Sequence, residues 1–404
     1  MKFLLYLFVL FCFFPYIDIF RLGTDTQPNA LIVGLMLLTV IRNKRINLPL
    51  ILLWTVFLMS IFLIFYNNVS FFIYLKNTFN YLSPALVATT TYLILDHLKF
   101  KLHFKVFIGI ISVYAIVGLI QLYLFPTFLN SLVNGAGRGT LVGGRGVVSL
   151  FSEPAFYGTT CLFFLTYSLL VYNKRQNKWA TVILIFQLIF LSRSATAIAI
   201  FLFGFGIFTL VQILKFKLSY VLSTVFFLLL MMPVVLHYQN KIESTRAGGL
   251  AKTFIENPLL ITQIDGSVGI RFTGTVAPFL SMRHHYMKPQ GLGYYIEFLR
   301  DFRRKRMYSS FLTINNSESK PRLSGSLNMV LYQLGFLGLL FPLAIYLAFR
   351  GQLHSNLVLF AFILFLVALM TQIQMMNGMI GFIIGTAIYR GKVKRMTTSQ
   401  KTLS

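Results

Sequence analysis

The stretch that decides the fold reads GGRGVVSLFSEP over residues 143–154 and continues as AFYGTTCLFFLTYSLLVY to residue 172. A glycine-rich loop that carries an arginine runs directly into an apolar segment long enough to cross a membrane as a helix. Glu153 lies inside this apolar run, and the sequence has no other carboxylate between Asp96 and Glu243. Because a charge within a membrane segment is expensive and usually functional, Glu153 is the first candidate for a site.

The composition around this stretch is that of a membrane protein. Of the 404 residues, 57% are hydrophobic and 11% are charged, and the mean hydropathy is +0.75, whereas soluble proteins carry about 25% charged residues. The sequence therefore predicts an all-α, polytopic membrane helical bundle of about 12 transmembrane helices, with 10–12 as the range because several apolar runs are short. The runs fall near 3–20, 29–41, 48–66, 71–95, 104–125, 147–172, 179–191, 194–214, 218–236, 326–349, 355–371 and 373–389.

Basic residues in the short loops predict the orientation of the bundle. Lys and Arg gather near residues 42–45, 99–105, 174–178 and 215–217, at Arg350 and in the tail, all on one side of the twelve runs. By the positive-inside rule that side is cytoplasmic, so both termini are expected to be cytoplasmic. The first run is expected to be a retained span, because no small-residue cleavage site follows it.

Two loops are expected on the outer side, and they divide the chain into three parts. Residues 1–236 form the first nine spans of the bundle and include a Gly-rich outer loop at 126–146. Residues 237–325 form a large outer (periplasmic) loop, and residues 326–404 form the last three spans and a basic cytoplasmic tail.

The large loop is cationic and is expected to meet the membrane surface. It holds thirteen basic and six acidic residues, a net charge of +7 within the overall +26. In a soluble protein such a balance would indicate nucleic acid, but here it predicts an anionic partner at the membrane surface and no nucleic acid. An interfacial amphipathic helix is expected within the loop, because apolar residues recur with helical spacing at Tyr295, Phe298, Leu299 and Phe302.

Glu153 is the candidate general base. If the helix begins near Val147, then Ser149, Glu153, Tyr157 and Thr160 share one polar face, and Glu153 lies roughly 9 Å below the loop edge. Tyr157 is then expected to contribute to substrate binding. Glu153 is expected to be reachable from the outer side and to accept a proton there as a general base. The alternative is structural: Glu153 pairs with Arg145 or another arginine and holds the loop against the bundle.

The arginines that are expected near Glu153 predict an anion-binding site, because a guanidinium fork matches phosphate oxygens. Arg145 and Arg271 join Glu153 as candidate catalytic residues. The candidate substrate-binding residues are Arg138, Arg193, Arg283, His284 and Tyr157. Arginines at loop ends also serve as anchors for lipid headgroups, and this alternative stays open for Arg138 and Arg193. No metal site or cofactor is expected, because no carboxylates stand at metal-ligand spacing and Cys12 and Cys161 have no neighbouring ligands.

Several short motifs together resemble the O-antigen polymerase (Wzy-type) and O-antigen ligase superfamily of integral membrane glycosyltransferases. The motifs are Arg145-Gly-Val-Val-Ser-Leu-Phe-Ser-Glu153-Pro154, Ser192-Arg193-Ser194, Ser267-x-Gly-x-Arg271, Gly291-Leu-Gly293, Ser324-Gly-Ser-Leu-Asn328 and Leu334-Gly335-Phe-Leu-Gly338. The resemblance implies a GT-C-like bundle in the bacterial cytoplasmic (inner) membrane. It also implies action on undecaprenyl-pyrophosphate-linked oligosaccharide at the outer face, in lipopolysaccharide or other polysaccharide biosynthesis.

Two departures from the family pattern bear on the activity. Leu327 occupies the position at which ligases of the superfamily place a histidine, which favours a polymerase. The second departure argues against a polymerase: the arginine-x10-glycine pattern of some polymerases is absent, because Phe156 and Met282 stand at those positions after Arg145 and Arg271. The expected function is therefore a polymerase of O-antigen, capsule or exopolysaccharide that is metal-independent and works with membrane lipids and a chain-length regulator protein. The alternatives are a flippase or transporter of the lipid-linked oligosaccharide, and an O-antigen ligase.

Overall fold

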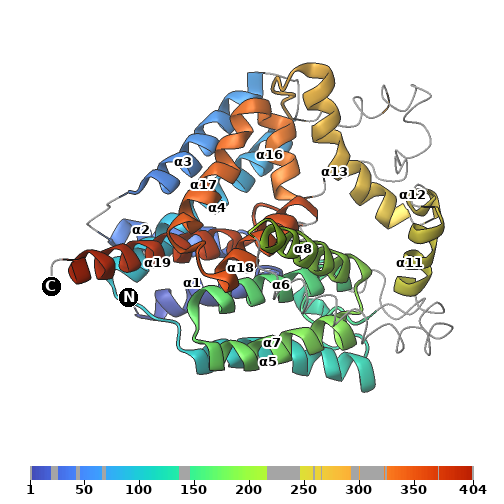
Figure 1. The fold of residues 1–404 in the computed structure, drawn as a ribbon, viewed down its shortest axis with the longest axis horizontal. Helices are drawn as coiled ribbons and strands as arrows, with labels where there is room; N and C mark the ends of the chain where they lie inside the picture. The colour runs from blue at the N-terminus through green and yellow to red at the C-terminus, as the bar shows by residue number, and fades with distance from the viewer. Residues whose placement is uncertain are drawn as a thin grey trace.

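The computed structural model is built from helices (Figure 1). The structure describes residues 2–19, 26–41, 46–65, 70–135, 146–215, 246–257, 260–264, 266–292, 300, 323, 325–371 and 373–402. Within these ranges no strand occurs, and a single antiparallel bridge joins Ile17 to Val133. The predicted all-α class is therefore confirmed for the described part of the chain.

The helices fall in two stretches of sequence, before and after residue 216. The first stretch contains α1 (Lys2–Phe13), α2 (Asn29–Val40), α3 (Leu48–Ile61), η1 (Phe62–Phe65), α4 (Phe71–His97), α5 (Phe104–Tyr123), η2 (Asn130–Leu132), α6 (Pro154–Val171), α7 (Lys174–Phe186), the π-helical segment η3 (Gln187–Ser192) and α8 (Ala195–Leu214). The second contains α11 (Arg246–Glu256), α12 (Ile261–Ile264), α13 (Gly266–His285), α16 (Ser326–Leu334), η4 (Gly335–Leu339), α17 (Leu340–Phe349), η5 (Arg350–Gln352), α18 (Asn356–Thr371) and α19 (Gly378–Thr402).

Four helical stretches are long and apolar enough to cross a membrane: Phe104–Tyr123, Pro154–Val171, Ala195–Leu214 and Ser326–Gln352. Four shorter apolar helices, α1, α2, α3 and α18, accompany them. These helices indicate a membrane protein, but they do not confirm a bundle of twelve spans. The apolar run predicted at 3–20 ends as a helix at Phe13, just before Pro15, which cannot continue the ladder of hydrogen bonds. The run at 218–236 and the predicted apolar stripe of Tyr295, Phe298, Leu299 and Phe302 lie outside the described residues.

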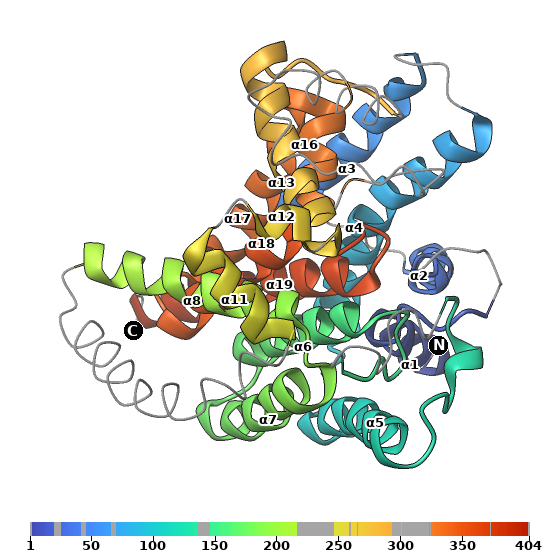
Figure 2. The same ribbon diagram turned by 90° about the vertical axis from the view of Figure 1, so that its right-hand side faces the viewer.

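Helix α6 is the centre of the structure. In both views α5 and α7 lie on one side of it, and α18 lies on the other (Figures 1 and 2). Nearly all of its residues are buried, whereas only about a quarter of α8 is buried. Aromatic contacts fill the space around it, including Phe163 on Phe365 with ring centroids 5.3 Å apart. A helix that is apolar on every face is expected in the interior of such a bundle.

Helices α4 and α19 approach each other closely. A Cβ atom on Gly381 would lie 2.6 Å from Cβ of Val87, and one on Gly385 would lie 2.5 Å from the carbonyl oxygen of Ala88. Small residues at such crossings let two helix backbones pack directly on each other. Glycine at both positions is therefore required for this contact.

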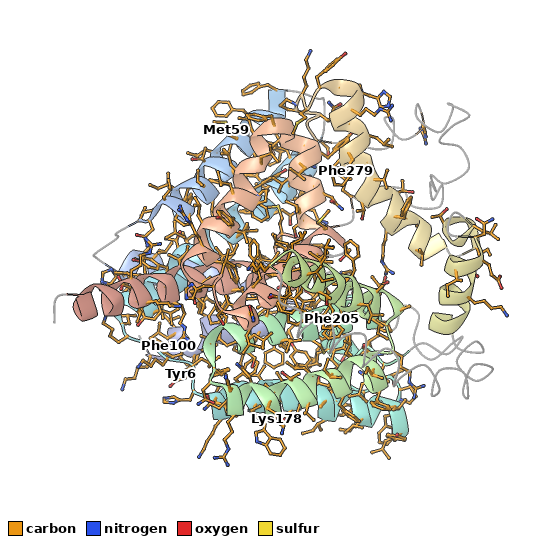
Figure 3. The ribbon with its side chains drawn as sticks, in the orientation of Figure 1. Tyr6, Met59, Phe100, Lys178, Phe205 and Phe279 are labelled. Atoms are coloured by element: carbon orange, nitrogen blue, oxygen red, sulfur yellow. The ribbon has the colours of Figure 1, made fainter. Side chains whose placement is uncertain are left out.

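The two ends of α6 lie in different surroundings. At its carboxyl end, the hydroxyl of Tyr172 donates to the carbonyl oxygen of Leu102 in the α4–α5 connection, 3.2 Å away. Phe100 of the same connection packs edge-on against Tyr6, and Lys178 lies on the outer surface of α7 (Figure 3). The basic residues of these connections thus gather at the carboxyl end of α6. Its amino end lies about 27 Å away, at 1.5 Å per residue.

Candidate functional site

Glu153 precedes the first residue of α6 and has an extended backbone, with φ −142° and ψ 152°. The prediction of a helix from Val147 is therefore wrong, and Glu153 does not lie inside a helix. Pro154 explains the boundary, because proline is favoured at the first helical position and forces the residue before it out of helical geometry. Ser149 has a left-handed backbone with φ +52°, so it shares no helix face with Glu153. Tyr157 and Thr160 do lie in α6.

The segment 146–153 is held in place by contacts that replace those of a helix. The backbone N–H of Ser149 donates to the side-chain oxygen of Gln121 at 2.7 Å, and the amide nitrogen of Gln121 donates to the carbonyl of Ser149 at 2.9 Å. The hydroxyl of Ser149 donates to the carbonyl of Tyr114 at 2.8 Å. The polar groups of Ser149, in this buried and irregular segment, are satisfied through α5 in this way.

Gly146 brings this segment against the turn before α8. The N–H of Val147 donates to the carbonyl of Leu191 at 2.9 Å. A Cβ atom on Gly146 would lie 2.2 Å from the carbonyl oxygens of both Leu191 and Ser192, so no other residue fits there without movement. The motif that ends in Glu153 and the Ser192-Arg193-Ser194 motif are therefore neighbours in space.

Arg271 of α13 reaches Glu153 from the second half of the chain. Its Nη2 lies 3.5 Å from Oε2 of Glu153, and its Nη1 donates to Oγ1 of Thr196 at 2.7 Å. The side chains of Arg271 and Glu153 remain 19% and 33% exposed. The pair is thus loose and partly accessible, and it joins the amino ends of α6 and α8 to α13.

The motif that ends in Asn328 meets α13 one turn after Arg271. The hydroxyl of Thr275 donates to the carbonyl of Arg271 at 2.9 Å, and Nδ2 of Asn328 lies 3.4 Å from that hydroxyl. Asn328 also donates to the carbonyl of Met370, and Ser326 donates to the carbonyl of Ile373. The motif that ends in Asn328 therefore anchors α13 next to Arg271.

The remaining glycine motifs also pair with each other. The N–H of Gly291 donates to the carbonyl of Gln333 at 3.2 Å, and the N–H of Phe336 donates to the carbonyl of Met287 at 2.8 Å. Gly335 has φ +57°, and a Cβ atom there would lie 2.1 Å from the carbonyl oxygen of Met287. Motifs that are scattered along the sequence are thus brought together in adjoining pairs.

The other predicted site residues are placed differently. Arg193 is exposed and donates through Nε to the carbonyl of Phe190 at 3.1 Å. Arg283 and His284 are exposed in the last turn of α13, so Arg283 stands about 18 Å along that helix from Arg271. Tyr157 is buried and its hydroxyl donates to Gln187 at 2.8 Å, which gives it a packing role. Their roles in binding substrate stay predictions.

Arg138 and Arg145 lie outside the described residues, so the predicted pairing of Arg145 with Glu153 stays untested. Among the described residues, no group of three or more His, Cys, Asp or Glu could hold a metal ion. Sequence reasoning missed Thr196 and Gln121, which orient the two sides of the site. Thr196 follows the Ser-Arg-Ser motif by two positions, and this proximity was the available signal.

Comparisons with known proteins found no match among family models, curated proteins or solved structures. The function is therefore argued from the residues of the site.

Proposed function

We propose that the protein is a polysaccharide polymerase that joins undecaprenyl-pyrophosphate-linked oligosaccharide repeat units at the outer face of the bacterial cytoplasmic membrane. The observation that carries the proposal is the loose pairing of Glu153 with Arg271. A carboxylate and a guanidinium side by side suit the two halves of this reaction, which needs a base for a sugar hydroxyl and a cation for a pyrophosphate leaving group.

The reaction follows from these two groups. Glu153 accepts the proton of the acceptor hydroxyl, whose oxygen attacks the anomeric carbon of the donor chain. The bond from that carbon to the pyrophosphate oxygen breaks, and undecaprenyl pyrophosphate leaves with the bonding electrons. Arg271 binds the charge that develops on the leaving group, because guanidinium nitrogens match phosphate oxygens. Arg145, expected from the sequence to share this task, remains part of the proposal.

The loose Glu153–Arg271 pair also explains how donor binding can make Glu153 available as the base. Nη2 of Arg271 lies 3.5 Å from Glu153, whereas charged hydrogen bonds are usually about 2.7–2.9 Å long. A pyrophosphate carries more negative charge than one carboxylate and attracts the guanidinium more strongly. Donor binding therefore draws Arg271 from Glu153 and leaves the carboxylate available to the acceptor hydroxyl.

The position of the site supports the outer face. Glu153 and Arg271 lie at the amino end of α6, and the basic connections before α5 and α7 lie at its carboxyl end. By the positive-inside rule the basic end faces the cytoplasm. The site then opens to the outer side, with both termini cytoplasmic and the donor's lipid tail in the bilayer. A GT-C-like bundle and a chain-length regulator as partner belong to the same proposal.

A purified-protein assay tests the proposal. The protein in detergent is incubated with undecaprenyl-pyrophosphate repeat units as the sole substrate, with and without a chelator. Products of two or more repeats in both reactions are the expected result, because donor and acceptor are the same molecule and no metal is required. Unchanged substrate, in protein that melts cooperatively, would contradict a polymerase. Transport of the intact unit across proteoliposomes would then indicate a flippase.

A further inference from the structure

We propose that Thr196 is a positioning residue that aims the Arg271 guanidinium at the site and keeps it there when Glu153 releases it. The inference rests on the proposed function, since it names how the anion-binding arginine is oriented. Thr196 itself touches neither substrate nor reacting atoms in this account. It acts only through Arg271.

The first step is that Thr196 stands on a rigid support. It lies in the first turn of α8, which is capped by Ser194, whose hydroxyl accepts from the N–H of Ala197 at 3.2 Å. This turn packs directly on α6, because a Cβ atom on Gly158 would lie 2.6 Å from Cβ of Ala197. The distance between Thr196 and the start of α6, where Glu153 lies, is therefore fixed by backbone packing.

The second step is the geometry of the guanidinium. Nη1 is bound to Thr196 at 2.7 Å, whereas Nη2 stands 3.5 Å from Glu153. Because the guanidinium is planar and rigid, fixing one terminal nitrogen limits the directions in which the other can point. The shorter of these two contacts is the one to the neutral hydroxyl. Thr196 therefore holds the guanidinium through an atom that carries no formal charge.

The third step is the contrast with other threonines. The hydroxyls of Thr55, Thr159 and Thr166 each bond the carbonyl four residues earlier in the same helix. This is the usual local bond of a helical threonine. Thr196 instead accepts a hydrogen bond from a side chain 75 residues away in sequence. Its hydroxyl therefore has a tertiary role that the others lack.

The test uses Thr196→Val, which keeps the shape and removes the hydroxyl, Thr196→Ser, which restores it, and Thr55→Val as a matched control. Elongation kinetics are measured for purified wild type and each variant. We expect Thr196→Val to lower kcat/KM for the lipid-linked repeat unit about tenfold, the effect of one hydrogen bond to a charged group that binds the pyrophosphate and stabilises it as it leaves. Thr196→Ser should restore kcat/KM, and Thr55→Val should match the wild type. A wild-type kcat/KM in Thr196→Val, or no rescue by serine, would overturn the assignment.

A second measurement does not depend on turnover. Carbodiimide labelling of Glu153, followed by mass spectrometry, reports how well Arg271 covers the carboxylate. Labelling is expected to be faster in Thr196→Val and to stay at the wild-type rate in Thr196→Ser and Thr55→Val. Unchanged or slower labelling in Thr196→Val contradicts the positioning role even if the wild type polymerises. If the wild type lengthens nothing but the labelling result holds, the polymerase proposal fails and the positioning of Arg271 stands. Thr196→Ala replaces the valine variant if the latter does not fold.

Discussion

Two carboxylate–cation pairs lie near opposite ends of the bundle and differ in almost every physical respect. Asp96, in the last turn of α4, accepts two hydrogen bonds from Nζ of Lys392 in α19, at 2.8 and 2.7 Å, and its side chain is only 7% exposed. Glu153 meets Arg271 through a single contact of 3.5 Å and is 33% exposed. We call Asp96–Lys392 the closed pair and Glu153–Arg271 the open pair.

The difference reflects what surrounds each acid. Asp96 lies where α4 and α19 pack backbone against backbone, and Lys392 also lies over the ring of Tyr92, 5.8 Å from its centroid. Glu153 lies where an irregular segment, a turn and α13 meet, so no continuous helix contact encloses it. Both sites pair a carboxylate with a cation, but the two pairs have different roles. The closed pair stabilises a helix contact, and the open pair leaves a base and an anion-binding group within reach of a ligand.

The largest expected effect is on activity, through Glu153→Gln. The amide keeps the shape of the side chain but cannot take the proton from the hydroxyl of the acceptor sugar. Polymer formation should therefore fall at least ~100-fold. Polymer ladders from cells that express the variant check this, with protein level measured in parallel. Glu256→Gln, an exposed carboxylate in α11, is the matched control and should leave ladders unchanged. Normal ladders with Glu153→Gln would remove the open pair from the chemistry.

The next largest effect is a loss of stability in Gly385→Leu, where α4 and α19 pack near the closed pair. A side chain there overlaps the Ala88 carbonyl, so α4 and α19 must separate, at a cost of about 3 kcal/mol or more. Folded yield and melting temperature in detergent measure the loss. Gly206→Leu on α8 is the control, since a Cβ atom there meets nothing within 4 Å. Equal melting temperatures for the two variants would argue against the close α4–α19 contact.

A smaller effect is expected from Asp96→Asn. It removes a charge-assisted interaction of a buried acid and should lower the free energy of unfolding by roughly 1.5–3 kcal/mol. The double variant Asp96→Asn/Lys392→Met should recover part of the loss, because it leaves no unpaired charge. Melting temperatures of the single and double variants decide this. A double variant less stable than the sum of its single changes would contradict the pairing.

The smallest effect is a pH dependence. Hydrogen bonding to Asp96 raises the pKa of Lys392 above its ordinary value of 10.5. A lysine whose pKa is higher in the folded state stabilises the fold fully below its unfolded pKa, and this contribution is lost as pH rises through the folded value. The difference in melting temperature between wild type and Lys392→Met should therefore be constant from pH 7 to 9 and shrink above roughly pH 10.5. A difference that shrinks already below pH 9 would contradict this.

Hydropathy predicted the all-helical class, and the isolation of Glu153 marked it as a candidate. The start of α6 could not be read from hydropathy, because residues 147–152 are mostly apolar and are buried as an irregular segment just as they would be in a helix. What decides between the two is Gln121, a side chain on another helix that satisfies the backbone of Ser149. Pro154 was the local signal for the boundary.

The composition of the site depends on contacts between distant parts of the sequence. Arg271 bonds Thr196, 75 residues earlier, and Asn328 meets Thr275, 53 residues earlier. No local pattern encodes such pairings, which arise only when α13 docks on α16 and on the start of α8. The short motifs lie near one another in the structure because glycines at 146 and 335 permit the close backbone approaches that bring them together.

The most direct test of whether the open pair carries the chemistry is to measure elongation by equal amounts of folded wild-type, Glu153→Gln and Asp96→Asn protein. The substrate is the undecaprenyl-pyrophosphate repeat unit, and turnover is expressed per folded molecule. The account predicts wild-type turnover for Asp96→Asn, despite its lower melting temperature, and at least ~100-fold slower turnover for Glu153→Gln at an unchanged melting temperature. Equal turnover by the two variants would contradict the assignment of chemistry to the open pair.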